Sequence, residues 1–274
     1  MSIYDGKKVL ITGASAGIGY ALSEELAKRG SEVIITARRK DRLEALAQKI
    51  KDAGGKAHIF VEDLSLPESG IKLYDQIKSA GLNIDILINN AGYGRWGELT
   101  SYERDDYSKM LQLNVTTLTD LCHLYITDMV AQGGGGIINV GSMASLSPIP
   151  YASVYSSSKA YVLMFSEAIR YEYQDKEIKV MALLPGGTES EFASVATEKS
   201  EKLTKRNQER EGSAAGGAMQ TSLEVAIECL DAFEKNKQYF LCGGRNRFLY
   251  NLTRIMSRQR VLEMTGRMFK KIAG

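Results

Sequence analysis

Short apolar runs alternate with amphipathic stretches along most of this chain of 274 residues. Apolar runs of about four to eight residues between polar or glycine-rich punctuation are typical of buried strands, and longer periodic stretches are typical of helices. We predict long helices near 102–131 and 153–175, and strands at residues 7–12, 31–37, 56–61, 84–88, 136–141, 177–184 and 238–242. This alternation predicts a single α/β domain, a doubly wound, mostly parallel Rossmann-type sheet with helices on both faces.

The segment from Arg245 to Gly274 departs from that pattern. It carries eight basic residues and one acid, Glu263, a net charge of +7, so the rest of a chain of net charge +2 carries −5. Apolar residues recur there at roughly helical spacing. A basic amphipathic helix can lie on an anionic membrane, pack on a second subunit or cover a pocket. We favour packing on protein over membrane contact, and divide the chain into a catalytic domain, 1–244, and an extension, 245–274.

Composition narrows the class of protein. Hydrophobic residues make up 44% and charged residues 25%, as in an ordinary soluble globule. No signal-peptide pattern and no apolar run of about 18 residues is visible, and the three cysteines form no CxxC, which together indicate reduced thiols and a cytoplasmic protein. With only His58 and His123 beside the cysteines, we expect no metal site. We also expect no nucleic-acid partner.

A glycine-rich turn follows the first predicted strand. Lys8–Thr12 is apolar, Gly13, Gly17 and Gly19 follow, and a periodic helical stretch begins at Tyr20. Such a turn lets the backbone approach a pyrophosphate, whose charge the helix N-terminus then binds. The spacing is GxxxGxG rather than the GxGxxG of the general dinucleotide fingerprint.

A tyrosine and a lysine stand four residues apart in the second long helix. Tyr155 and Lys159 therefore share one helix face, and Ser142 precedes Tyr155 by 13 residues. A fixed ammonium is expected to lower the pKa of the phenol from about 10, which suits a general acid or base. A surface Tyr–Lys pair is the alternative interpretation of this spacing.

These features occur in the order found in one family. The glycine turn from Thr12 to Gly19, Asn89–Gly92, Asn114 with Ser142, the Tyr155–Lys159 pair and Pro185–Thr188 follow one another along the chain. Over roughly residues 7 to 242 the sequence resembles the short-chain dehydrogenase/reductases. The resemblance implies an oxidoreductase that interconverts a ketone and a secondary alcohol by hydride transfer to or from a nicotinamide cofactor.

The resemblance also implies roles for individual residues. Tyr155 would exchange a proton with the substrate oxygen, Lys159 would tune Tyr155 and bond the nicotinamide ribose, and Ser142 would hold the substrate oxygen. Asn114 would kink its helix and anchor a water of the proton relay. The residues expected to bind the cofactor are Gly13, Ser15, Gly17, Ile18, Gly19, Arg38, Arg39, Asp63, Leu64, Asn90, Ala91, Gly92, Tyr155, Lys159, Pro185, Gly186, Thr188 and Ser190.

The end of the second strand indicates which cofactor binds. NAD sites usually place an acid there to bond the ribose 2′-hydroxyl, but this chain has Arg38 and Arg39, with no acid before Asp41. Guanidinium groups bind a 2′-phosphate in a bidentate manner. We therefore predict NADP(H) rather than NAD, although these arginines could also merely solvate the start of a helix.

The substrate and the assembly are less well defined by the sequence. Residues expected near the substrate are mainly apolar and predict a hydrophobic ketone or alcohol: Tyr93, Arg95, Trp96, Met143, Leu146, Ile149 and Tyr151. The resemblance implies a substrate lid at 188–220 and a homodimer or homotetramer built on the long helices. Two rivals are an NADP-binding sensor without turnover and a serine hydrolase using Gly13-Ala14-Ser15-Ala16-Gly17, formally GxSxG.

Overall fold

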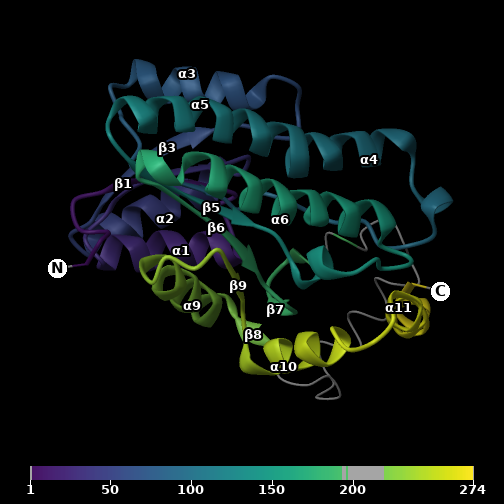
Figure 1. Ribbon diagram of the computed structural model, residues 1–274. Helices are drawn as coiled ribbons and strands as arrows, with labels where there is room; N and C mark the ends of the chain where they lie inside the picture. The colour runs from purple at the N-terminus through teal and green to yellow at the C-terminus, as the bar shows by residue number, and fades with distance from the viewer. Residues whose placement is uncertain (1, 193–195, 197–218, 274) are drawn as a thin grey trace.

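A seven-stranded parallel sheet forms the centre of the molecule, seen in the computed structural model of Figure 1, which describes residues 2–192, 196 and 219–273. Its strands lie in the order β3-β2-β1-β4-β5-β6-β9. Their bounds are β1 Lys8–Thr12, β2 Glu32–Ala37, β3 Lys56–Val61, β4 Ile86–Asn89, β5 Gly135–Val140, β6 Ile178–Leu184 and β9 Tyr239–Leu241. The seven predicted strands and the doubly wound fold are confirmed.

Strand order reverses direction between β1 and β4, where chain crossovers leave toward opposite edges of the sheet. Ligands of doubly wound folds bind at such a switch point, beyond the carboxyl ends of the strands. The register pairs Ile11 of β1 with Ile35 of β2 and Ile88 of β4, all fully buried. A short parallel pair, β7 Thr188–Glu189 with β8 Gln220–Thr221, is too brief for a sequence pattern to predict.

Helices cover both faces of the sheet. In Figure 1, α3, α5 and α6 lie above it and α1, α2 and α9 below. One buried cluster joins the sheet to α1, α2 and α9, and another joins it to α3, α5 and α6. The bounds of these helices are α1 Gly17–Lys28, α2 Lys40–Asp52, α3 Ser69–Ser79, α5 Leu118–Ala131, α6 Ser153–Tyr173 and α9 Ser222–Glu234. A capping box of Thr221 and Glu224 opens α9.

The helix predicted over 102–131 is broken by a wide turn. It consists of α4, Arg104–Leu111, a π-helical segment, Gln112–Thr117, and α5. Such π segments often occur at functional sites because they re-aim a side chain. Here the segment carries Asn114. Short 3-10 helices also occur at Leu99–Ser101, Met143–Leu146 and Gln174–Lys176.

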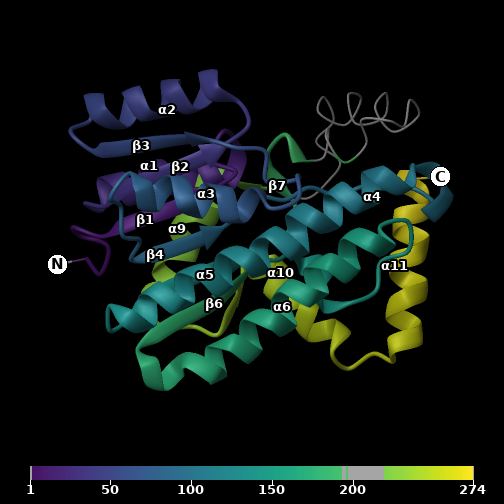
Figure 2. The same cartoon turned by 90° about the horizontal axis from the view of Figure 1, so that it is seen from above.

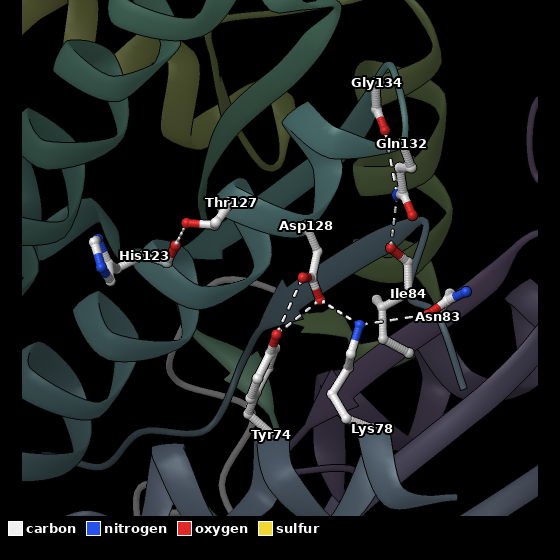
Figure 3. A network of polar contacts seen from close by, with 9 residues as sticks. All are labelled: Tyr74, Lys78, Asn83, Ile84, His123, Thr127, Asp128, Gln132 and Gly134. Atoms are coloured by element: carbon white, nitrogen blue, oxygen red, sulfur yellow. Dashed lines mark hydrogen bonds and ion pairs between the residues drawn. The ribbon is translucent and has the colours of Figure 1, made fainter. Parts of the chain in front are cut away.

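Polar contacts fix α5 against α3, as Figure 3 shows. The Asp128 carboxylate accepts hydrogen bonds of 3.1 Å from the Tyr74 hydroxyl and pairs with Lys78 Nζ at 3.0 Å. At the end of α5, the Gln132 amide donates to the carbonyl of Ile84 at 3.1 Å. These contacts anchor the end of α5 that lies farthest from Asn114, so the π segment that carries Asn114 extends from a fixed support.

The extension forms two further helices, α10 Gly244–Thr253 and α11 Arg258–Ala273. In Figures 1 and 2, α10 lies below the sheet and α11 lies at the end of the molecule that also carries α4. Thr265 of α11 is buried, and its hydroxyl donates to the carbonyl of Pro148 at 3.2 Å. Among the helices that the structure describes, none combines the length and hydrophobicity that a bilayer crossing requires. Residues 193–195 and 197–218 of the predicted lid lie outside the described residues.

Candidate active site

Ser142 lies just past the carboxyl end of β5. It caps the short helical turn Met143–Leu146, where its hydroxyl accepts from the N–H of Ala144 at 3.1 Å. Ser145 completes this capping box and also donates to the carbonyl of Lys159 at 2.7 Å. The turn is thereby tied to α6. The cap fixes the Ser142 hydroxyl, which lies close enough to the phenol of Tyr155 to act on its pKa.

Tyr155 is buried in the first turn of α6, and its position raises its pKa. Burial raises the pKa of the phenol to about 12, and the hydrogen bond with Ser142 acts in the opposite direction. The expectation that Lys159 would lower this pKa is wrong for this structure, because burial outweighs every other influence. The phenol is therefore protonated throughout the neutral range, as a proton donor must be.

Lys159 is buried one helical turn further on. Its ammonium donates to the carbonyl of Val140, the last residue of β5, at 2.8 Å. Burial lowers the pKa of Lys159 to about 8. A Cβ on Gly92 would lie 3.2 Å from Lys159 Nζ and 3.0 Å from Asn114 Oδ1, so both side chains converge on one glycine.

Asn114 is fully buried within the π-helical segment. Its amide donates to the carbonyl of Tyr93 at 2.9 Å and to the Ser158 hydroxyl at 3.1 Å, and its oxygen accepts from the N–H of Tyr93 at 3.2 Å. It thus joins three elements: the helix that it interrupts, the segment after β4 and α6. The structure brings Asn114, Ser142, Tyr155 and Lys159 into one region at the carboxyl end of β4 and β5.

Aromatic rings run outward from this region. Phe192 lies 5.5 Å from the Tyr155 ring, Trp96 lies 6.4 Å from Phe192, and Phe269 of α11 lies 6.0 Å from Trp96. Because Phe269 belongs to the extension, α11 helps to enclose the approach to Tyr155. Neither Phe192 nor Phe269 is suggested by the sequence, since each reaches the site only through tertiary packing.

The other residues expected near the substrate divide into two groups. Tyr93 and Ile149 pack in the cluster that contains Tyr155. Met143 and Leu146 are partly buried and pack against core residues of β6 and β9. Arg95 is nearly buried, 3.8 Å from Asp106, with its guanidinium facing the rings of Tyr93 and Tyr102.

The glycine turn has the geometry of a phosphate-binding loop. Gly13 and Gly17 have φ of +69° and +58°, which L side chains rarely adopt. A Cβ on Gly13 would lie 2.9 Å from Ala91 Cα, and one on Gly19 would clash with the Asn90 amide. Helix α1 begins at Gly17 without a side-chain cap or an acidic residue in its first turn, so its first N–H groups can receive an anion.

Two arginines follow β2, in different surroundings. Arg39 donates to the Ser15 hydroxyl from Nε at 3.2 Å and from Nη2 at 3.0 Å. It also pairs with Glu191 at 2.7 Å, and Arg42 approaches the same carboxylate at 2.6 Å. The Arg38 side chain is 68% exposed and lies 3.9 Å from Asp63. Glu191, which the sequence did not suggest, has its pKa lowered by hydrogen bonds from Arg42 and Arg39.

The remaining residues that we expect to bind the cofactor lie beyond the carboxyl ends of the strands. Asn90 bonds the carbonyl of Thr12 at 2.8 Å, and Leu64 is buried. The carbonyl of Pro185 accepts from the N–H of Met143 at 2.9 Å, which links the end of β6 to the turn after Ser142. Ser190 approaches the turn, since a Cβ on Gly17 would lie 3.1 Å from Ser190 Cβ. Ile18 lies in the first turn of α1, Gly186 follows β6, and Thr188 begins β7.

The rival sites lack support in the described part of the chain. Ser15 contacts Arg39 rather than a histidine, while His58 pairs with Glu32 at 2.6 Å, so no hydrolase triad forms around GxSxG. Among the described residues, no group of three or more His, Cys, Asp or Glu side chains could hold a metal ion. The three cysteines are free and buried.

Comparison with known proteins decides the family. Residues 7–201 match the family described as short chain dehydrogenase. The chain belongs to the short-chain dehydrogenases. This match covers the glycine turn, Asn114, Ser142, Tyr155 and Lys159, and confirms the resemblance that the sequence motifs carry.

Individual relatives place the chain within the short-chain dehydrogenases. It is 30% identical to a human very-long-chain 3-oxoacyl-CoA reductase in an alignment of 203 residues that covers 69% of this chain and 62% of that protein. It is 36% identical to an uncharacterized oxidoreductase of Thermotoga maritima over 188 residues, 69% of this chain and 74% of the other. The chain thus spans 62% of the length of the curated reductases that it matches first.

A solved short-chain dehydrogenase from Sphingobium yanoikuyae in complex with NADPH has the same fold. The two share 28% identity and a TM-score of 0.77, over 90% of this chain and 93% of the other.

Proposed function

We propose that this chain is an NADP(H)-dependent oxidoreductase that interconverts a hydrophobic ketone and a secondary alcohol by hydride transfer. The observation that carries the proposal is the convergence of Ser142, Tyr155, Lys159 and Asn114 at the carboxyl end of β4 and β5. A protonated, buried phenol whose pKa a fixed hydroxyl helps to lower is suited to proton exchange with an alcohol or carbonyl oxygen.

The residues at the switch point fit a dinucleotide. Gly13 and Gly19 leave no room for a Cβ, which keeps the backbone of the turn close to any pyrophosphate, and the uncapped start of α1 offers N–H donors. Arg39 is already held over Ser15 at the end of β2, with Arg38 beside it. Two guanidinium groups and no acid at this strand end favour a 2′-phosphate over a free 2′-hydroxyl. The NADPH-bound relative is consistent with this choice.

The chain's own residues would divide the work as follows. The bound nicotinamide supplies or accepts the hydride. In the reducing direction, Tyr155 gives its proton to the substrate oxygen while Ser142 donates a hydrogen bond to the same oxygen. Lys159 stabilises the phenolate that remains. Asn114 donates hydrogen bonds to the backbone of Tyr93 and to Ser158 of α6, and so fixes the segment after β4 against the helix that carries Tyr155 and Lys159.

The surroundings of Tyr155 support an apolar substrate. Phe192 lies against the Tyr155 ring, and Trp96 and Phe269 continue the apolar lining outward. A bulky hydrophobic group beside the reacting carbon would contact these rings, whereas a sugar would leave its hydroxyls unpaired.

A screen of NADPH oxidation tests the proposal. We expect turnover with medium- to long-chain or cyclic ketones, and little with small polar ketones or sugars. The same screen with NADH reports the cofactor preference. Absence of turnover with every ketone and every secondary alcohol, despite measurable NADPH binding, would favour the NADP-binding sensor instead.

We also propose that the enzyme forms a homodimer or homotetramer through the long helices. Leu111 of α4, Tyr161 and Met164 of α6 are large apolar side chains that face solvent in the single chain. Apolar surface on a second face of such helices is usually covered by a partner. Light scattering of the purified enzyme tests this, and a monodisperse monomer at all concentrations would contradict it.

A further inference from the structure

Helix α10 presents an apolar stripe to solvent. None of its residues is buried. Phe248 is 70% exposed, Leu252 is 48% exposed, and Ile255, just beyond the helix, is 83% exposed. Residues four apart lie on one side of a helix, so Phe248 and Leu252 share one exposed side of α10, and Ile255 follows in the turn after the helix. Single exposed apolar residues are ordinary, but neighbouring ones on the solvent side of a helix whose Tyr250 packs against the core are typical of an interaction surface.

Helix α11 adds a second exposed apolar face. Val261 and Thr265 are buried against the rest of the molecule, which fixes the helix in place. Met264 and Met268, also four residues apart, are exposed on a different face of the helix. The anchored α11 therefore presents this pair on a fixed support, rather than as part of a loose tail.

Positive charge surrounds both apolar faces. Arg247 is used within the molecule, near Glu228 and over the Phe240 ring. The other cations whose side chains the structure describes in the extension are exposed: Arg245, Arg254, Arg258, Arg260, Arg267 and Lys270. Because the extension carries +7 and the rest of the chain −5, the charge is strongly polarised toward α10 and α11.

The positive charge of this surface favours a negatively charged binding partner. A second copy docked tail to tail through a two-fold axis would place +7 against +7, which like-charge repulsion opposes. An anionic lipid bilayer offers negative headgroups to the arginines and an apolar interior to Phe248, Leu252 and Ile255. In place of the packing on protein that the sequence alone favoured, we propose that α10 and α11 dock this enzyme on anionic membrane surfaces, with the apolar side chains inserted at the headgroup boundary.

Docking in this orientation has a consequence for the site. α11 contacts Pro148 through Thr265 and Trp96 through Phe269, and Trp96 belongs to the aromatic line that leads to Tyr155. The approach to Tyr155 would then lie beside the membrane. The docking itself does not depend on the proposed reaction, since it rests only on the exposed surface of the extension.

Vesicle binding by the full chain tests the proposal. We expect the partition onto phosphatidylcholine vesicles containing about 30% phosphatidylglycerol to exceed that onto neutral vesicles at least about tenfold, and to fall when salt is raised from about 0.1 to 0.5 M. Phe248→Asp with Leu252→Asp, or Arg254→Glu with Arg258→Glu, should each reduce the partition about tenfold or more, while leaving NADPH binding unchanged.

Ile71→Asp is the matched control. Ile71 is 44% exposed, close to the value for Leu252, but it belongs to α3, at the opposite end of Figure 1 from α10. The partition of Ile71→Asp onto anionic vesicles should equal that of the wild type. Equal binding to neutral and anionic vesicles, or full binding by both double variants, would overturn the proposal. The proposal would also be overturned if the wild type bound no vesicles and Phe248→Asp converted a dimer into a monomer, because the surface would then bind a second copy of the chain.

Discussion

Replacing Arg39 by alanine should separate the two nicotinamide cofactors. Arg39 is already restrained by Ser15, so it loses little freedom when it contacts a 2′-phosphate, but it must give up its ion pair of 2.7 Å with Glu191. A hydrogen bond to a charged group contributes about 1.5–3 kcal/mol, or about 10- to 150-fold in affinity. In the wild type, Arg39 must break its ion pair with Glu191 to bind the phosphate, which offsets part of this gain. We therefore expect Arg39→Ala to weaken NADPH binding by about 10- to 30-fold, the lower end of that range.

The assay is a fluorescence titration of NADPH and NADH at constant ionic strength. NADH lacks the 2′-phosphate, so its dissociation constant should change less than about threefold. Lys40→Ala is the control: it removes one positive charge from the adjacent residue, whose ammonium pairs with Glu44 at 3.6 Å. Equal weakening of both cofactors by Arg39→Ala, or an equal effect of Lys40→Ala on NADPH, would refute a direct contact with the phosphate.

Two further substitutions probe the same site. Glu191→Gln should tighten NADPH binding and leave NADH binding unchanged, because it removes the carboxylate that competes for Arg39 and Arg42; parallel titrations measure both. Lys159→Met should abolish turnover yet raise the unfolding free energy at pH 7 by about 1–3 kcal/mol, because burial lowers the pKa of this lysine from 10.5 to about 8.

Lys159→Met should raise the unfolding free energy because the folded state binds the Lys159 proton less firmly than the unfolded state does. Between pH 8 and 10.5 the unfolded state holds the Lys159 proton more firmly than the folded state, so the stability of the wild type rises with pH across that range. The gain from Lys159→Met should therefore be full below pH 8 and disappear toward pH 10.5; urea denaturation at several pH values measures it. A gain that does not depend on pH would contradict the assignment of this pKa. Weaker or unchanged NADPH binding by Glu191→Gln would likewise show that its carboxylate does not compete.

Local patterns were sufficient to predict the sheet and the tight glycine turn after β1. Buried parallel strands are continuous apolar runs, and the positive φ of Gly13 and Gly17 is what only glycine adopts readily, so both features are visible in the sequence. The break in the helix at Asn114 came from the family resemblance rather than from periodicity, because a π segment adds one residue without changing the apolar content.

Tertiary packing accounts for what the sequence did not predict. Glu191 and Phe192 reach Arg39 and Tyr155 only because the chain folds back after β6. Lys159 was expected to control the pKa of Tyr155, but the extent of burial, which no local pattern reports, decides it. Met143 follows Ser142 directly, yet its side chain turns into the core beside β6.

The most direct test of the proposed reaction is the turnover of Tyr155→Phe beside its affinity for NADPH. We predict that the rate of ketone reduction falls by at least about 100-fold, since the variant has no proton to give, while the dissociation constant of NADPH changes less than about twofold. Tyr161 lies on the exposed side of α6, the helix that also carries Tyr155, and its hydroxyl is hydrogen-bonded to Thr119 of α5. The control variant Tyr161→Phe removes that hydroxyl and should retain full activity. Turnover by Tyr155→Phe near that of the wild type would contradict the role of Tyr155 as proton donor.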